Sequence, residues 1–338
     1  MNLVGTECNY LQKYMKNRVG LGTFPLAGVF NPISKIDAEK IVRSFIDQSG
    51  YYIDTAPLYG LGDVEEMLGE ALKDVPRKKY YVITKGGKVI TPEKQVITSG
   101  TYKDTIKECE NSLRRLRVDY IDLYMIHSPD PNTPFSETME AMKRLKKEGK
   151  ILQMAVSNVS LKELKEFNKD GEISYVQNRF SLINRSLNKE FTDYLLQHKI
   201  FLIPYHLLEI GLLTGIASEN FKLRKGDLRE ALLYWNKENQ DVIFSWVRKN
   251  LSPLAKKLNI TIGQLNIAWA LLQKFINFVV IGTTKQEYLG INLKANNIIL
   301  SEKTQIEINH TYSELENKIK VMYNMPIRQF RGLNEKYY

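Results

Sequence analysis

Hydrophobic and polar positions along this chain change period again and again. Short runs of apolar residues, the length of a buried strand, occur at about 19–24, 51–54, 80–84, 121–127, 151–157, 173–177, 200–205 and 277–282. Between these runs the apolar residues return at helical spacing, as at Ile41, Phe45 and Ile46. Strands that alternate with helices in this way predict βα units and a parallel sheet.

Two architectures are compatible with such a sheet. A doubly wound open sheet normally carries a glycine-rich phosphate turn after its first strand, and the turn Gly60-Leu61-Gly62 lacks the third glycine of that fingerprint. The second architecture is a closed barrel of eight βα units, and it is favoured by the eight repeats and by the lack of a linker rich in Pro, Gly or Ser. We therefore predict a single (β/α)₈ TIM barrel over residues 1–338.

One repeat is much longer than the others. The stretch between Tyr205 and Phe278, which separates the predicted strands 7 and 8, exceeds what one βα unit requires. Its segment 218–240 is rich in charged residues. Because barrel insertions of this kind lie over the C-terminal rim, residues 206–260 are predicted to contain a lid or substrate loop.

Composition excludes several classes of protein. A hydrophobic fraction of 43% and a charged fraction of 25% are ordinary for a globular protein. The net charge is +10, but the lysines are scattered along helical faces, and no basic block is interleaved with aromatic residues. The excess charge predicts a solvated surface or attraction of an anionic ligand, and no nucleic-acid partner. The histidines lack metal-ligand spacing, so no metal site is predicted.

The apolar runs and the cysteines of the chain also bear on its location. Residues 1–16 lack the apolar core of a signal peptide, and no apolar run reaches the roughly 18 residues that a membrane helix needs. Cys8 and Cys109 lie far apart, which makes a disulfide framework improbable. These features predict a cytoplasmic protein without a membrane partner. The oligomeric state is not readable from the sequence.

Four reactive side chains stand where predicted strands end. The run before Asp54 stops there, and Tyr59 follows in the turn; Lys85 and His127 close the next two runs. Taken singly, each residue has an ordinary structural reading, such as a capping aspartate or a core histidine. In a barrel, however, the C-terminal strand ends meet on one rim, where catalytic groups gather. We therefore predict that these four residues form one site.

The residue types suit proton transfer to a carbonyl. A phenol titrates near about 10 in water, and a neighbouring ammonium is expected to lower that pKa. A carboxylate would keep the lysine charged, and an imidazole would orient or polarise the carbonyl oxygen. The hydride that must reach the carbonyl carbon has to come from a cofactor, because no side chain can supply it.

The motif Asp-Thr-Ala-x-x-Tyr-Gly at Asp54–Gly60, the strand-end Lys85 and the run that ends at His127 resemble the aldo-keto reductase family. The resemblance covers nearly the whole chain. It implies that Tyr59 is the general acid, that Lys85 and Asp54 tune it, and that His127 orients the carbonyl of a small-molecule substrate.

The resemblance also implies NADPH as cofactor, with NADH as second choice. The implied cofactor-binding residues are Ser157, Asn158, Gln177, Tyr205, Leu207, Gly211, Leu213, Gly282, Thr283, Thr284, Lys285 and Asn292. Tyr205 would stack on the nicotinamide ring. Three departures from the family pattern, His206, Tyr288 and Ile291, weaken the expected preference for NADPH.

The substrate is the least readable part of the site. Phe24, Phe30 and Tyr102 are candidates to line its pocket, and the positive charge favours a sugar-like or anionic carbonyl. Two rival functions remain open. The first alternative to carbonyl reduction is a regulatory subunit that senses the nicotinamide redox state. The second is an aldolase that forms a Schiff base on Lys85.

Overall fold

The computed structural model describes residues 17–216, 221–232 and 235–323. Its main sheet has eight parallel strands in the order β10-β1-β2-β3-β6-β7-β8-β9. They are β1 (Val19–Gly22), β2 (Tyr52–Asp54), β3 (Tyr81–Gly86), β6 (Ile121–Ile126), β7 (Ile151–Ser157), β8 (Ile173–Arg179), β9 (Phe201–Tyr205) and β10 (Val279–Gly282). A parallel bridge between Leu202 and Ile276 joins the two ends of this order. The predicted (β/α)₈ barrel and its eight strands are confirmed.

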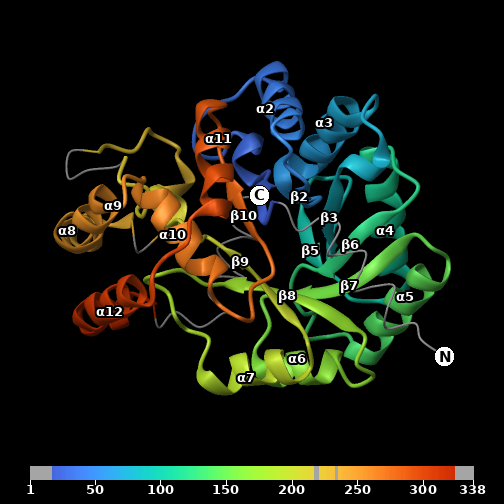
Figure 1. Cartoon of the computed structure of the whole chain (residues 1–338). Helices are drawn as coiled ribbons and strands as arrows, with labels where there is room; N and C mark the ends of the chain where they lie inside the picture. Colours follow the sequence, from blue (N-terminus) through green and yellow to red (C-terminus); the bar gives the residue numbers. More distant parts are fainter. Residues whose placement is uncertain (1–16, 217–220, 233–234, 324–338) are drawn as a thin grey trace.

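Helices surround the barrel in Figure 1. The helices that follow the strands are α2 (Lys35–Asp47), α3 (Asp63–Leu72), α4 (Tyr102–Leu116), α5 (Phe135–Lys147), α6 (Leu161–Phe167), α7 (Lys189–Gln197) and α11 (Glu287–Lys294). Several begin at a residue whose side chain satisfies the first free backbone N–H groups. In α6, for example, Ser160 and Glu163 form a reciprocal capping box.

The inside of the barrel is closed at its N-terminal end by aromatic rings. Tyr52 stacks on Phe278 with ring centroids 4.0 Å apart, and Tyr81 and Tyr175 pack beside them. All four side chains are buried. Because this end is filled, the opposite end, where the strands terminate, is the end that offers room for a ligand.

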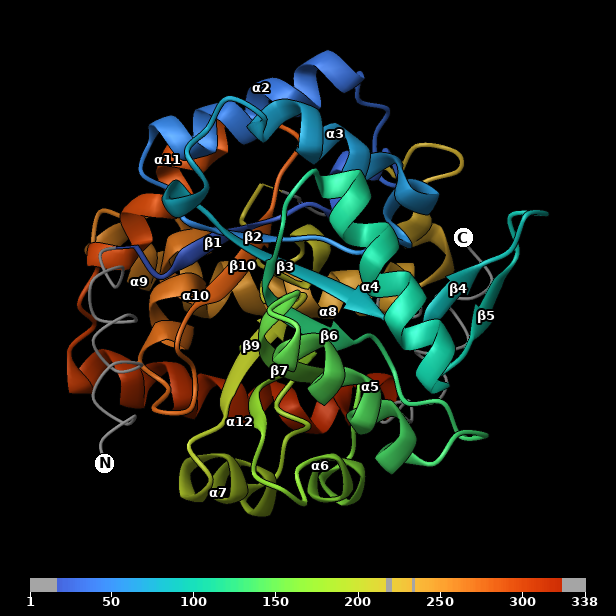
Figure 2. The same ribbon diagram turned by 90° about the vertical axis from the view of Figure 1, so that its right-hand side faces the viewer.

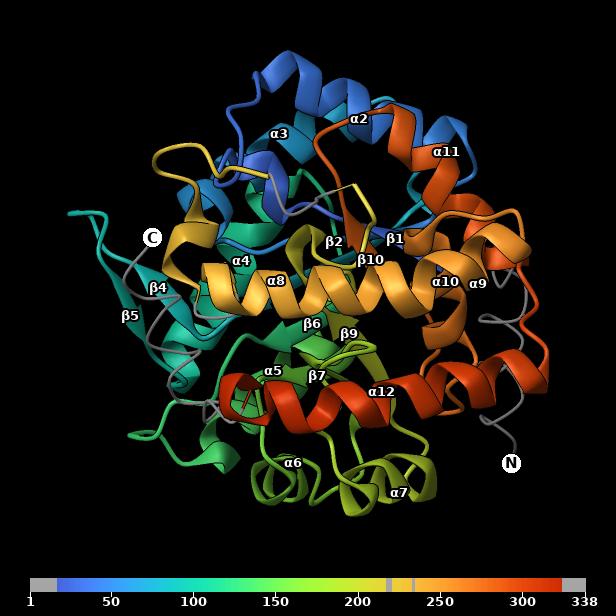
Figure 3. The ribbon, with the colours of Figure 1, turned by 90° about the vertical axis from the view of Figure 1, so that its left-hand side faces the viewer.

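The insertion between β9 and β10 has two parts. The first contains the short turns η4 (Glu209–Gly211) and η5 (Leu228–Ala231). The Leu228 backbone N–H donates to the Val29 carbonyl at 3.0 Å, which ties this part to the loop after β1 on the C-terminal rim. The second part is helical and consists of α8 (Lys237–Trp246), the π-helical turn η7 (Val247–Leu251), α9 (Ser252–Lys257) and α10 (Ile262–Leu271). In Figure 3, α8 runs along the outside of the barrel beside α12 (Glu302–Tyr323).

One element was absent from the sequence prediction. An antiparallel hairpin of β4 (Lys88–Ile90) and β5 (Val96–Thr98) follows β3 and projects from the barrel in Figure 2. Each strand is only three residues long and half-exposed. Such strands are too short to produce a readable alternation of polar and apolar residues.

Candidate active site

The ends of three neighbouring strands bring the four reactive residues together. Asp54 is the last residue of β2, Lys85 is the penultimate residue of β3, and His127 directly follows β6. The strands β2, β3 and β6 are adjacent and parallel, so their C-terminal ends meet on one edge. Tyr59 begins the turn η2 (Tyr59–Gly62), which directs its ring toward this edge.

Lys85 is the centre of the group. Its side chain is buried, and its Nζ lies 2.9 and 3.1 Å from the two carboxylate oxygens of Asp54. The same ammonium donates to the Thr55 carbonyl at 2.8 Å and to the Tyr59 hydroxyl oxygen at 3.3 Å. Burial lowers the pKa of Lys85, and the charge of Asp54 opposes that change. A short, buried contact of this kind fixes the ammonium against the phenol.

The pKa of Tyr59 moves in the direction opposite to the sequence-based expectation. Burial raises the pKa of Tyr59 well above its ordinary value, and the negative charge of Asp54 and the neighbouring phenol of Tyr205 act in the same direction. The expected lowering by Lys85 was wrong, because desolvation of the phenolate outweighs the neighbouring ammonium. Tyr59 therefore keeps its proton at neutral pH. Since its oxygen accepts from Lys85, the proton of the hydroxyl is left for another acceptor.

His127 closes the group on the other side. Its ring lies edge-on to Tyr59 with centroids 6.4 Å apart. Burial lowers the pKa of His127 well below its ordinary value, and the charges of Lys85 and Lys88 reinforce this. Its Nδ1 is buried and has no hydrogen-bond partner among the described residues. The imidazole is therefore neutral at physiological pH and can donate only one hydrogen bond.

A second group of polar side chains adjoins the first. Gln177 donates to Asp54 Oδ2 at 2.9 Å, and Asn158 donates to the His127 carbonyl at 2.9 Å. Ser157 donates to the Gln177 carbonyl at 2.8 Å, and the Tyr205 hydroxyl donates to Asn158 Oδ1 at 2.7 Å. Asn158 adopts a left-handed backbone conformation with φ 57°, which asparagine tolerates better than most residues other than glycine.

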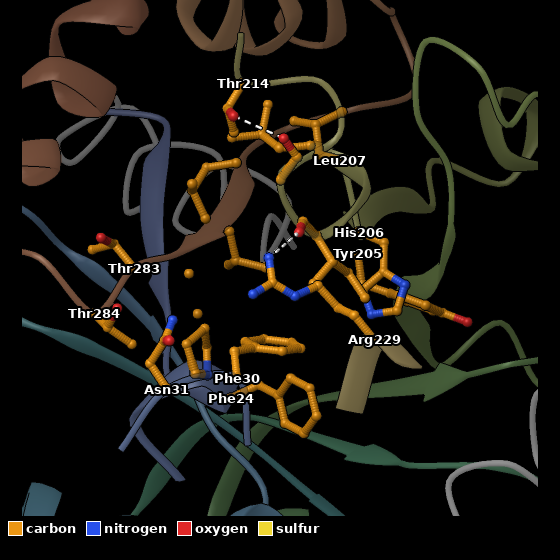
Figure 4. A pocket seen from close by; sticks show the side chains of 18 of the residues that line it. Phe24, Phe30, Asn31, Tyr205, His206, Leu207, Thr214, Arg229, Thr283 and Thr284 are labelled. Atoms are coloured by element: carbon orange, nitrogen blue, oxygen red, sulfur yellow. Dashed lines mark hydrogen bonds between the residues drawn. The ribbon is translucent and has the colours of Figure 1, made fainter. Parts of the chain in front are cut away.

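Both groups open into one pocket of about 800 Å³. It extends from the reactive side chains to the loop after β10, and Figure 4 shows Tyr205 and His206 on one side of it and Thr283 and Thr284 on the other. The predicted residues that line it are Asp54, Tyr59, His127, Ser157, Asn158, Gln177, Tyr205, Leu207, Gly211, Gly282, Thr283, Thr284, Lys285, Phe24 and Phe30.

Four predicted residues do not line this pocket. Lys85 lies beneath its surface and reaches it through Tyr59. Leu213 is fully buried, and Asn292 lies on α11. Tyr102 is the first residue of α4, where its backbone N–H donates to Glu137 at 2.8 Å. The pocket thus includes two of the three substrate candidates.

Several lining residues were missed by sequence reasoning. Asn31, Ile210, Asp227 and Arg229 all contribute to the pocket from loops without a periodic pattern. Ile210, Asp227 and Arg229 lie within the predicted lid or substrate loop, and the charged run that includes Gly226–Arg229 was its signal, but no role was assigned to any one of these residues. Asn31 lies outside the insertion and carried no signal.

Comparison with known proteins bears on the identity of this site. The model of the aldo/keto reductase family matches residues 18–312. The chain belongs to this family. It is 31% identical to the aldo-keto reductase YhdN of Bacillus subtilis, over 90% of this chain and 91% of that protein. It is 30% identical to the NADH-specific methylglyoxal reductase of Escherichia coli, over 85% and 91% of the two chains.

Solved structures of the family agree with the fold. The glycerol dehydrogenase of Gluconobacter oxydans has 28% sequence identity and a TM-score of 0.81, with 88% of this chain and 91% of that chain covered. An aldo-keto reductase of Klebsiella pneumoniae, solved in complex with NADPH, has 25% identity and a TM-score of 0.67, with 87% and 90% covered. This aldo-keto reductase is accordingly an NAD(P)H-dependent oxidoreductase.

The pocket fits a nicotinamide dinucleotide. It offers amide and hydroxyl groups next to the reactive residues, and a lysine with two threonines at the other end. Tyr205 adds an aromatic face between these ends. Within the described ranges, no group of three His, Cys, Asp or Glu side chains is placed to hold a metal ion. The helices in the described part of the chain are also too short or too polar to span a membrane.

Proposed function

We propose that this enzyme reduces an aldehyde or ketone to the alcohol, with Tyr59 as the proton donor and NADPH as the preferred cofactor. The observation that carries the proposal is the contact between Lys85 Nζ and the Tyr59 oxygen at 3.3 Å, inside a buried Lys85–Asp54 pair. Because Lys85 fills an acceptor position of the phenol, the phenolic proton is available to a carbonyl oxygen in the pocket.

A reduced nicotinamide, when bound, supplies the hydride. Ser157, Asn158 and Gln177 would hold its carboxamide, as the family resemblance implies, and Tyr205 would support its ring. Tyr59 gives its proton to the carbonyl oxygen as negative charge develops there. The phenolate that remains would be stabilised by the ammonium of Lys85, whose own charge is balanced by Asp54.

His127 would orient the carbonyl. Because its Nδ1 is buried, Nε2 is the nitrogen left to face the pocket, and a proton on Nε2 would donate to the carbonyl oxygen. The low pKa of His127 keeps the imidazole neutral, so it would align the substrate without competing with Tyr59 as the acid.

The proposed preference for NADPH depends on one lysine. Lys285 lines the far end of the pocket beside Thr283 and Thr284, where a 2′-phosphate would lie by family resemblance. Glu287 lies 3.8 Å from Lys285 and reduces the local positive charge. We therefore expect a modest preference for NADPH and measurable use of NADH. A cytoplasmic location, where both cofactors occur, is part of the same proposal.

Replacement of Tyr59 by Phe tests the proton donor. Tyr59→Phe should lower kcat for aldehyde reduction by about 10²- to 10⁴-fold. NADPH binding, followed by quenching of its fluorescence, should be retained because the ring remains. Tyr194→Phe, on the outer helix α7, is the matched control. Full activity of Tyr59→Phe would refute the assignment, and borohydride trapping of a carbonyl on Lys85 would support the aldolase instead.

A further inference from the structure

The most unusual contacts of the pocket belong to Arg229, which comes from the insertion. Its guanidinium lies over three aromatic rings, with its central carbon 4.7 Å from the ring centroid of Trp235, 5.3 Å from Phe221 and 5.4 Å from Phe30. Figure 4 shows this side chain reaching across the pocket toward Phe24 and Phe30. The insertion thereby contacts the loop that follows β1.

The charge of Arg229 is already balanced. Its Nε and Nη2 donate to the two carboxylate oxygens of the buried Asp227 at 2.9 and 2.6 Å, and its Nη1 lies 3.5 Å from the Ile210 carbonyl. Three of its five N–H donors are engaged and its charge is paired, so it attracts an anionic substrate less strongly than an unpaired guanidinium would. Its planar face remains available to pack on rings, which is a role that arginine serves well.

Phe30, one of the three rings that Arg229 covers, is part of an aromatic wall. Phe30 meets Phe24 edge-on with centroids 5.5 Å apart, and Phe24 meets Tyr59 at 5.1 Å. The wall therefore runs from the guanidinium to the proposed proton donor. The hydrogen bond from Leu228 N–H to the Val29 carbonyl fixes the backbone next to both contacting residues.

We propose that Arg229 is a positioning residue for substrate selection, which holds Phe30 in an apolar wall that receives an uncharged hydrocarbon or aromatic substituent of the carbonyl substrate. This inference rests on the proposed reduction and names its substrate class. It departs from the sugar-like or anionic substrate suggested by net charge, because the wall consists of aromatic rings and the guanidinium that covers it is paired with Asp227. The insertion then contributes to specificity through a ring on another loop.

Two aldehydes that differ only in their substituent test the wall. Benzaldehyde and propanal would be compared by kcat/KM with saturating NADPH. The wild type should prefer benzaldehyde, and Arg229→Met should lower that preference by about tenfold, chiefly through KM for benzaldehyde. Arg229→Lys keeps the charge without the planar face and should also lose much of the preference. It serves as the second variant if Arg229→Met does not fold.

Arg224→Met is the matched control. Arg224 belongs to the same insertion and lines the same pocket, but it is exposed and stacks on no ring in the described part of the chain. Its loss should change both aldehydes by the same factor and leave their ratio unmoved.

A double-mutant cycle tests whether Arg229 acts through Phe30. In Phe30→Ala the benzaldehyde preference should already be lost, so adding Arg229→Met should lower it no further. Additive losses would overturn the inference, as would equal losses for both aldehydes or a wild type without preference for benzaldehyde. These results are separable from the proposed reduction, which fails only if Tyr59→Phe remains active.

Discussion

The two ends of the pocket each carry a lysine beside a carboxylate, and the two pairs differ in almost every physical respect. Lys85 Nζ lies 2.9 Å from Asp54 Oδ1, and the two side chains are 1% and 5% exposed. Lys285 Nζ lies 3.8 Å from Glu287 Oε1, and each of these side chains is 64% exposed. Water screens the second pair but not the first, so equal formal charges have very different consequences.

This difference separates chemistry from affinity. The buried pair is surrounded by further hydrogen bonds to Thr55, Tyr59 and Gln177, which leave it a single geometry. The exposed pair is not surrounded by hydrogen bonds of this kind among the described residues. The Lys285 backbone N–H does donate to the Thr283 hydroxyl at 3.0 Å. We therefore expect substitutions at the reacting end to affect turnover strongly and those at the far end to adjust cofactor binding.

Of the two lysines, Lys85 is expected to have the larger effect on turnover. Lys85→Met should lower kcat by about 10²- to 10³-fold, because the Tyr59 phenolate would form without its ammonium and beside an uncompensated Asp54. Steady-state kinetics with benzaldehyde and NADPH measure this loss. Lys285→Met is the corresponding change at the other end and should leave kcat within about threefold of the wild type. Comparable losses in kcat from both variants would remove the distinction between the two ends.

Between the two ends lies a strained loop with an unusual histidine. His206, Glu209 and Ile210 all have positive φ values, between 46° and 54°, although none of them is glycine. Buried Arg179 and Ser181 both donate to the Glu209 carboxylate, which anchors the loop from below. Burial lowers the pKa of His206 to about 3, and the charge of Arg179 contributes. In this loop Glu209 is buried, whereas His206 and Ile210 are partly buried and line the pocket. The loop carries no proposed proton transfer.

His206, in this middle region, should make the free energy of unfolding depend on pH. The pKa of His206 in the folded chain is below the ordinary value of 6.5. Below that pH His206 is therefore protonated in the unfolded chain but stays neutral in the folded chain. Stability should therefore fall as the pH drops below about 6.5, by up to about 1.4 kcal/mol per pH unit from this residue. His206→Asn should remove up to about 1.6 kcal/mol of the loss in the free energy of unfolding between pH 6.5 and 5, measured by denaturant unfolding.

His127 changes stability in the same direction, since its pKa is also lowered, so the comparison of wild type with His206→Asn isolates one histidine. A pH slope that is identical in both proteins would mean that His206 titrates normally in the folded state.

The reacting end could be predicted from sequence because its information is local. Each of the residues Asp54, Lys85 and His127 follows its own apolar run, and the parallel order of the strands then places the ends together without knowledge of any loop. What failed there was the direction of the Tyr59 pKa shift. That direction depends on how completely the phenol is buried, which residue spacing does not show.

The loop side of the pocket could not be predicted in the same way. Arg229 meets Phe30 through two segments almost two hundred positions apart, neither of which has a periodic pattern. Tyr102 was a candidate to line the substrate pocket, yet it is the first residue of α4 and does not line the pocket. Contacts of this kind depend on the path of each loop, and a single sequence carries little information about it.

The smallest expected effect is at the exposed end. Lys285→Ala should weaken NADPH binding by a few fold, in line with about 1 kcal/mol or less for a solvent-exposed charge contact, and should leave NADH binding nearly unchanged. Glu287→Gln should act in the opposite direction, because it removes the negative charge 3.8 Å from Lys285. Both effects should shrink as salt is raised from 50 to 500 mM, since exposed charges are screened. Fluorescence titrations with the two cofactors measure these changes. An unmoved NADPH-to-NADH affinity ratio in both variants would place the 2′-phosphate elsewhere and leave the far end of the pocket without a role in cofactor choice.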